Sequence, residues 1–200
     1  MNMNSLLVQD SQLNEFACRC EALLFASEEP LSIERFQELL ETDNETIQAA
    51  LERLKSRLAE GSALCVAHVA GGYRLETKPE YLRDIRGFVQ AQKKSKLSMA
   101  ALETLALIAY KQPITAVEIA EMRMVSSVGP LIKNLLEKKF IKMAGRKQVV
   151  GRPMMYRTTK EFLVHFGLNH INDLPSLEEF AKTYAAQEEA DLPAMESEEA

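Results

Sequence analysis

The chain carries one pattern of residues twice. Pro30 and Pro113 stand 83 positions apart in the similar segments EEPLS and KQPIT, and Tyr73-Arg74 stands at the same distance from Tyr156-Arg157. Each Tyr-Arg pair is followed within a few residues by Thr-Lys, a Glu, an aromatic residue and a Leu. Because similarity at a fixed period indicates repetition of one structural unit, the sequence predicts two units of the same kind in tandem.

In the first copy, apolar residues at three- and four-residue steps predict helices over 10–27, 33–40 and 45–60. We expect Ser32 to cap the second helix and a residue within 42–44 to cap the third. A β-prone run on each side of Gly71-Gly72 then predicts a hairpin. The segment 79–92 again resembles a helix, with Pro79 in its first turn.

The second copy repeats this order. A helix ends before Pro113, Thr115 is placed to cap the segment 116–124, and Ser126 or Ser127 is placed to cap the segment 128–140. Two short β-prone runs follow, over 141–145 and 154–158. Three helices and a hairpin are the order of a winged helix-turn-helix.

The predicted fold is therefore mainly α with small β-hairpins, built from two tandem winged helix-turn-helix domains. The first covers residues 10–92 and the second covers residues 96–175. Residues 176–200 are acidic and Ala-rich and hold few large apolar side chains, so we predict a disordered acidic C-terminal tail.

The net charge of −5 hides a strong asymmetry along the chain. Residues 1–92 carry 9 Lys and Arg against 15 Asp and Glu, residues 93–160 carry 14 against 4, and residues 161–200 carry 1 against 10. A basic middle between acidic flanks indicates either an anionic partner or masking of the basic region by the tail.

Signals of catalysis, metal binding and membrane insertion are missing from the sequence. We find no signal peptide, no apolar run of membrane-spanning length, no phosphate-binding Gly-rich loop and no Gly-x-Ser-x-Gly elbow. The three Cys and three His show no metal-ligand spacing. We therefore expect a cytoplasmic protein that is not an enzyme, with no catalytic residue, no metal and no cofactor.

DNA binding is one interpretation of the basic region. A winged helix can place its second helix in the major groove and lay its hairpin along the backbone. The start of that helix offers no Arg, Asn or Gln for bidentate recognition of a base, so any DNA contact should be weak and non-specific. The candidate phosphate contacts are Lys133, Lys138, Lys139, Lys142, Arg146, Lys147, Arg152 and Arg157.

Protein binding is the interpretation that we favour. Gly145 and Gly151 free the backbone on both sides of the hairpin tip, and we expect Pro153 to hold Arg152 extended, so that arginines could clamp carboxylates of a partner. The hairpin also carries soft apolar residues, which suit either a partner surface or the filling of a small core; these are Met143, Met154, Met155 and Tyr156. The alternative function is that of a dimeric winged-helix DNA-binding protein, a transcriptional regulator.

The segment 97–175 closely resembles the segregation and condensation protein B (ScpB) family. The resemblance rests on LSMAALETLALIAYKQPIT, on LLEKKF, on the two Gly-Arg pairs with the second followed by Pro, on TTKEFL and on a final Asp-Leu-Pro. The N-terminal half agrees with the family in the order of its elements.

The resemblance implies a non-enzymatic adaptor subunit of the bacterial condensin-like complex, acting in chromosome condensation, chromosome partition and cell division. Such proteins form homodimers mainly through the first winged helix, here residues 10–92, and bind the kleisin ScpA through the second, here residues 96–175. Through ScpA they join SMC, and they associate with the nucleoid in the cytoplasm. No membrane contact is implied. The ScpA-binding positions carried over from the family pattern are Tyr110, Gln112, Pro113, Arg123, Arg146, Gly151, Arg152, Pro153 and Tyr156.

Two positions depart from the family pattern. The chain has Arg123-Met124-Val125 where Arg-Gly-Val is usual, and it has Ser126-Ser127-Val128 where an Asn-Ser and an acid are usual. Because Met124 removes the Gly of the turn, we expect a different local backbone or a different contact there.

Overall fold

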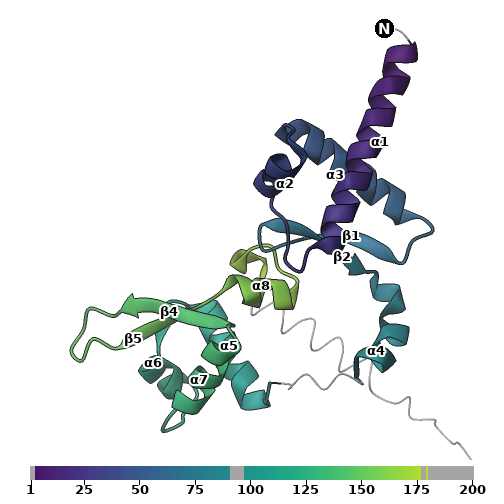
Figure 1. Cartoon of the computed structure of the whole chain (residues 1–200). Coiled ribbons are helices and arrows are strands. Elements are labelled where there is room, and N and C mark those ends of the chain that lie inside the picture. Colours follow the sequence, from purple (N-terminus) through teal and green to yellow (C-terminus); the bar gives the residue numbers. More distant parts are fainter. Residues whose placement is uncertain (1–2, 91–96, 177–178, 180–200) are drawn as a thin grey trace, which may run out of the picture.

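The computed structural model describes residues 3–90, 97–176 and 179 as a mainly helical chain with two small sheets (Figure 1). The predicted tail, 176–200, lies outside these residues except for Ser176 and Glu179. Among the described residues, no helix combines the length and apolarity needed to cross a membrane.

Three helices open the N-terminal half: α1 (Met3–Ala26), α2 (Ile33–Leu40) and α3 (Asn44–Ala59). The predicted caps of α2 and α3 are present. Ser32 Oγ accepts from the N–H of Arg35 at 3.4 Å, and Asp43 Oδ1 accepts from the N–H of Thr46 at 2.9 Å. The apolar faces of the three helices enclose one core, formed by Ala17, Cys20, Leu24, Phe36, Leu40, Ile47, Ala50, Leu51, Leu54 and Leu58.

A hairpin follows, formed by β1 (Leu64–Val69) and β2 (Gly72–Thr77). Its two turn residues are Ala70 and Gly71, with φ of 52° and 78°, as a tight two-residue hairpin turn requires. The predicted hairpin is confirmed, but Gly72 belongs to β2 rather than to the turn. A short 3₁₀ helix, η1 (Pro79–Tyr81), then leads into α4 (Leu82–Gln90).

Gly72 is required by a close approach of two backbones. Leu31 and Tyr73 exchange backbone hydrogen bonds of 2.9 and 2.8 Å, which bring the segment before α2 against β2. A Cβ on Gly72 would lie 2.9 Å from the carbonyl carbon and oxygen of Leu31. The absence of a side chain therefore permits this pairing.

The C-terminal half repeats the arrangement with one added strand. Its elements are α5 (Met99–Lys111), β3 (Ile114–Thr115), α6 (Ala116–Met122), α7 (Gly129–Glu137), β4 (Ile141–Arg146), β5 (Met154–Thr158), α8 (Lys160–Phe166) and the 3₁₀ helix η2 (Ile171–Asp173). The strands form an antiparallel sheet in the order β3-β5-β4. A second core gathers Leu105, Ile108, Ala109, Ile114, Ile119, Val128, Ile132, Leu135, Ile141 and Phe162.

The internal repeat is visible in the strand pairing. In the first half Leu31 pairs with Tyr73, and in the second half Ile114 pairs with Tyr156. Both members of the second pair lie 83 positions after their counterparts, the offset found in the sequence. The repeated Pro and Tyr-Arg residues therefore mark the same structural contact in both halves.

The predicted cap of α7 is wrong. The N-cap is Val128, whose side chain makes no capping hydrogen bond, and the hydroxyl of Ser127 accepts a 3.4 Å bond from the N–H of Gly129. Val128 is buried in the second core, so packing rather than capping sets the start of this helix. Pro130 in the first turn has no N–H to be satisfied, which reduces the need for a polar cap.

The two halves touch through the turn of the first hairpin. The N–H of Ala70 donates to the carbonyl of Leu168 at 2.9 Å, and the N–H of Gly71 donates to Asn169 Oδ1 at 2.8 Å. Figure 1 shows α8 close to the β1–β2 hairpin, between the two helical groups.

Candidate functional site

An apolar cleft of about 520 Å³ lies between α5 and the end of α6. The apolar part of its wall comes from successive turns of α5 and from Met122, the last residue of α6. Its residues are Glu103, Ala106, Leu107, Tyr110, Lys111, Met122 and Arg123. Two of the residues predicted to bind a partner, Tyr110 and Arg123, thus lie in one cleft.

Arg123 forms one wall of this cleft and ties α6 to α5. Its Nη1 donates to Thr104 Oγ1 at 2.9 Å, and its Nη2 donates to Glu103 Oε2 at 2.6 Å. The Arg123 side chain is 12% exposed, and Thr104 is fully buried. These two hydrogen bonds hold the guanidinium in place. It borders the cleft as a fixed, paired group and not as a free charge.

Tyr110 lies between the apolar cleft and the segment 171–176. Its hydroxyl donates to the carbonyl of Pro175 at 2.7 Å, while the residue as a whole is 37% exposed. A second hollow, of about 550 Å³, opens on the other side of the ring between the end of α5 and the segment 171–176. Tyr110 thus fixes the path of the last described residues beside the apolar cleft.

Gln112 and Pro113 join α5 to β3. Gln112 Oε1 accepts from the N–H of Thr158 at 2.7 Å and from its hydroxyl at 2.9 Å, and Thr158 is buried. The Gln112–Pro113 peptide bond is cis and leads directly into β3. Gln112 thus connects α5 to β5, whereas Pro113 is exposed directly before β3.

The tip of the β4–β5 hairpin contains four more of the predicted residues. Arg146 Nη1 donates to the carbonyl of Arg152 at 3.1 Å, and the N–H of Lys147 donates to the carbonyl of Pro153 at 2.9 Å. Gly151 has a φ of 83°, in the left-handed region that favours glycine. This agrees with the backbone freedom predicted for it. These bonds close the loop into an ordered turn.

The expected extended conformation of Arg152 is wrong. Its φ is 40°, in the left-handed region, and its N–H donates to the carbonyl of Val149 at 2.9 Å. A following proline disfavours the right-handed helical region for the residue before it, but the tight turn between the strands moves Arg152 to positive φ instead of to an extended backbone.

Tyr156 lies away from the hairpin tip. It occupies the middle of β5, paired with Ile114 on one side and Met143 on the other, and packs against the second core. Of the neighbouring methionines, Met154 and Met155 are half-buried, whereas Met143 is 60% exposed. Core filling therefore accounts for part of this apolar group, and Met143 remains on the surface.

A charge contact that the sequence analysis missed anchors the hairpin to α6. Lys147 Nζ donates to Glu118 Oε1 at 2.5 Å, and Glu118 Oε2 accepts from the N–H and hydroxyl of Thr115. These donors, Lys147 first, lower the pKa of Glu118 from 4.5 to about 2. The Thr-x-x-Glu spacing of a capping box, present at 115–118, is the signal that identifies the Thr115 half of this contact.

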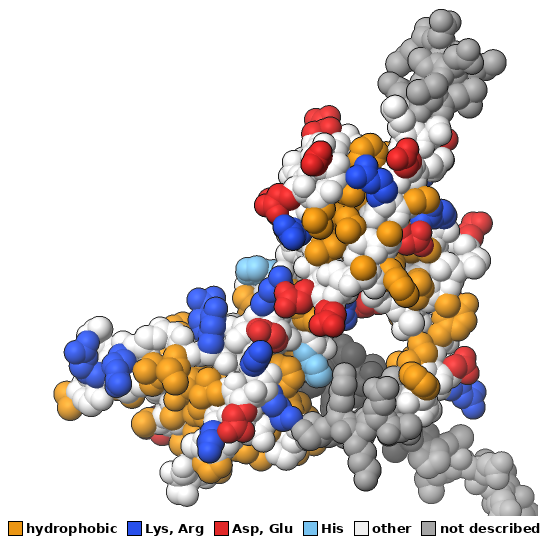
Figure 2. Space-filling model, in the orientation of Figure 1, with side chains coloured by type: hydrophobic (Ala, Val, Ile, Leu, Met, Phe, Trp, Pro, Cys, Tyr) orange, Lys and Arg blue, Asp and Glu red, His pale blue; other side chains and the backbone are white. Residues whose placement is uncertain are grey.

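Two exposed cations face each other across the hairpin. Lys142 and Arg157 are register partners in the β4–β5 pair, so both side chains stand on the same face. Within residues 3–90, 97–176 and 179, neither has a carboxylate partner. Figure 2 shows Lys and Arg side chains gathered along this hairpin with apolar side chains beside them.

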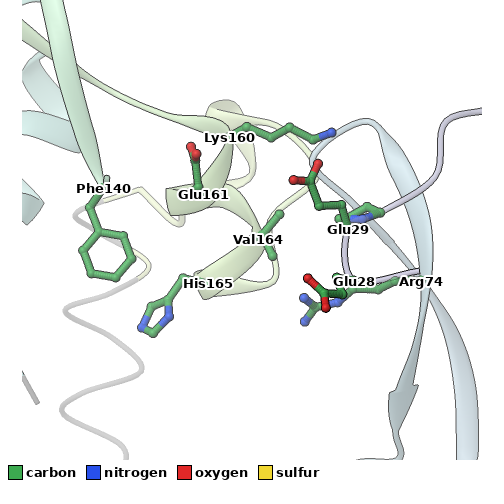
Figure 3. Close-up of a pocket in the computed structure, with 9 residues that line it drawn as sticks. Glu28, Glu29, Arg74, Phe140, Lys160, Glu161, Val164 and His165 are labelled. Atoms are coloured by element: carbon green, nitrogen blue, oxygen red, sulfur yellow. The ribbon is translucent and has the colours of Figure 1, made fainter. Parts of the chain in front are cut away.

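A third hollow, of about 400 Å³, lies where the two halves meet (Figure 3). Glu28, Glu29 and Arg74 line one wall, and α8 supplies Lys160 and His165 to the other. Lys160 extends across the hollow toward Glu29. Charges of both signs line this space, so it does not select strongly for a ligand of either sign.

No metal centre is evident among the described residues, and the buried thiol of Cys20 is not activated. No group of three or more His, Cys, Asp or Glu side chains in that part of the chain could hold a metal ion. Burial raises the pKa of Cys20 to about 11, which makes this thiol a poor nucleophile.

Comparison with known proteins gives a consistent result. A family model described as segregation and condensation complex subunit ScpB matches residues 18–177. Segregation and condensation protein B of Clostridium tetani is 39% identical over 187 residues, covering 93% of this chain and 98% of the relative. The same protein of Halalkalibacterium halodurans is 42% identical over 182 residues, covering 90% and 92%.

Among solved structures, a crystal structure of a dimer of the ScpB N-terminal domain complexed with a ScpA peptide is also similar. It shares 28% identity and covers 39% of this chain and 99% of that chain, with a TM-score of 0.37.

Proposed function

The chain belongs to the family of segregation and condensation complex subunit ScpB, and from this membership we propose that it is a non-enzymatic adaptor that binds the kleisin ScpA. A subunit of this kind serves chromosome condensation and segregation in the cytoplasm, at the nucleoid. ScpA is also the partner in the ScpB N-terminal-domain complex reported above.

We assign the two halves to two winged-helix domains, residues 10–92 and 96–175, with an acidic tail over 176–200. Each half has three helices followed by a hairpin and buries its own core, which supports this division. The first domain makes the homodimer. Apolar side chains left uncovered on that half suit this role, since Phe25 is 81% exposed, Phe88 is 73% exposed and Leu82 is 54% exposed.

The observation that carries the proposal is the apolar cleft between α5 and α6. A cleft lined by Ala106, Leu107 and Met122, with Tyr110 and the fixed Arg123 at its edge, fits the apolar side chains of an amphipathic helix. Arg146, Gly151, Arg152 and Pro153 form a separate surface at the hairpin tip. Gln112 bonds to Thr158 and Tyr156 pairs with Ile114, so both contribute to the packing of the same half, and Pro113 is exposed between α5 and β3.

The test is size-exclusion chromatography with light scattering on a mixture with ScpA from the same organism at about 150 mM salt, where exposed charges are screened beyond roughly 8 Å. We expect one complex whose mass fits two of these chains per kleisin. Separate elution, with a DNA duplex co-eluting instead, contradicts the proposal and supports a DNA-binding regulator.

A pair of substitutions locates the binding surface. Ala106 is exposed in the cleft and Ala49 is exposed on α3, so neither change to Arg creates a buried charge. We expect Ala106→Arg to weaken ScpA binding at least tenfold, which corresponds to about 1.4 kcal/mol, and Ala49→Arg to leave it unchanged. Equal affinity of the two variants would exclude the cleft.

A further inference from the structure

The Lys142–Arg157 pair is an unusual feature of an otherwise ordinary hairpin. Like charges directly opposite each other on neighbouring strands are destabilising. Both side chains are exposed on the same face, and within the described part of the chain no carboxylate offsets them. Such an arrangement favours an anionic group bound over the pair.

The chain itself contains a segment of the matching charge. Residues 97–160 carry 11 Lys and Arg against 4 Asp and Glu, a net charge of +7. Residues 180–200 carry 6 Asp and Glu against 1 Lys, a net charge of −5. The two stretches are therefore of opposite charge, and they belong to one molecule.

The last residues before this acidic segment are held near the base of the hairpin. Tyr110 holds the carbonyl of Pro175 at the end of α5. Gln112, two residues after Tyr110, accepts a hydrogen bond from the N–H of Thr158. Thr158 directly follows Arg157. Residues 180–200 extend at most about 70 Å, at roughly 3.3 Å per residue, so the segment can reach the whole hairpin.

We propose that residues 180–200 bind in cis to the exposed face of the β4–β5 hairpin, with their carboxylates over Lys142 and Arg157. In that position the segment shields the basic surface and competes with any other anion for it. This inference does not depend on ScpA. It rests on the charges of the two stretches and on the position of Pro175, which are properties of this chain alone.

The first test measures binding of a fluorescein-labelled peptide with the sequence of residues 180–200. It is titrated with the full chain and with a chain that ends at Glu179, in about 50 mM salt. An attached segment acts at an effective concentration in the millimolar range, so we expect the full chain to bind the peptide roughly tenfold more weakly than the shortened chain. Raising the salt to about 500 mM should abolish binding to the shortened chain.

A matched pair of variants locates the contact. In the shortened chain we expect Lys142→Glu with Arg157→Glu to remove peptide binding. Arg83→Glu with Arg86→Glu makes the same change of net charge at exposed positions of α4. We expect this variant to bind the peptide within about twofold of the shortened chain, because salt largely screens charges that lie far from the binding site. Circular dichroism checks that each variant is folded.

A full-length variant keeps the test valid if the shortened chain does not fold. Glu188→Gln, Glu189→Gln and Asp191→Asn together weaken the attached segment, so this chain should bind the peptide more tightly than the unmodified chain does. The proposal is overturned if the full and shortened chains bind the peptide equally, or if the α4 variant loses binding as the hairpin variant does. It is also overturned if the peptide fails to bind and a 20-base-pair duplex binds through Lys142 and Arg157 instead.

Discussion

The ammonium group of Lys147 lies 2.5 Å from Glu118 Oε1, which joins the tip of the β4–β5 hairpin to the first turn of α6. Glu118 also accepts two hydrogen bonds from Thr115, so one carboxylate organises both the start of α6 and the base of the hairpin loop. The hairpin is thereby fixed to the body of the domain at a point far along its length, and the surface that it presents has a defined orientation.

This contact should weaken in acid. The pKa of Glu118 falls from 4.5 to about 2 in the folded chain, so its contribution to stability is present above pH 4.5 and is lost as the pH falls through about 2. Because both side chains are partly exposed, the contribution is about 1 kcal/mol. Urea denaturation at pH 6, 4 and 2.5 should show a smaller pH dependence for Glu118→Gln than for the unmodified chain. Parallel pH profiles would contradict the assignment.

Met124 should be replaceable by Gly with a gain in stability. Its φ is 53°, and the N–H groups of Met124 and Val125 donate back to Glu121 and Ala120, the pattern of a Schellman motif at the end of α6. Its side chain is 94% exposed, so little packing is lost. We expect Met124→Gly to raise the free energy of unfolding by about 0.5–1 kcal/mol. Met122→Gly, at the last residue of α6, where the backbone is still right-handed helical, is the control and should lower it.

Truncation of the Gln112 side chain should lower the free energy of unfolding. Gln112→Ala leaves the N–H and hydroxyl of the buried Thr158 without their acceptor, which costs about 1–3 kcal/mol. Gln148→Ala, at an exposed position of the hairpin loop, provides the control and should have no measurable effect. Chemical denaturation compares the two variants, and equal stability would show that the Gln112 contact contributes nothing.

Gly72 should tolerate no side chain. Gly72→Ala places a Cβ 2.9 Å from the backbone of Leu31 and should lower the free energy of unfolding by about 1–3 kcal/mol. Gly87→Ala, on α4, meets no atom within 4 Å and should be neutral or stabilise by up to about 1 kcal/mol. Thermal unfolding distinguishes the two, and an unchanged melting temperature for Gly72→Ala would argue against the Leu31–Tyr73 pairing.

Patterns local to the chain predicted the elements well. The caps Ser32 and Thr115 needed only a side-chain oxygen followed by a helical pattern, and both are present. The cap of α7 failed as a prediction because burial of Val128 outweighed the preference of Ser127 for that position. Arg152 failed for a related reason, since closure of the hairpin loop fixed its backbone.

The candidate site was harder to predict than the fold. The family pattern selected Tyr110 and Arg123, which do share a cleft, but it also selected Gln112, whose partner is the buried Thr158. A motif records which residues matter and does not separate those that hold the domain together from those that face a partner. The Glu118–Lys147 contact spans 29 positions, beyond the range of local patterns.

By itself, the sequence determined the element order, the repeat at 83 positions, the family and the separation of charge along the chain, because each depends on residue type and spacing alone. The tertiary structure decided which polar side chains form hydrogen bonds within the domain, which cations face each other and where the apolar cleft opens. These properties depend on distances between residues that are remote in the chain, and such distances are set by packing around the two cores.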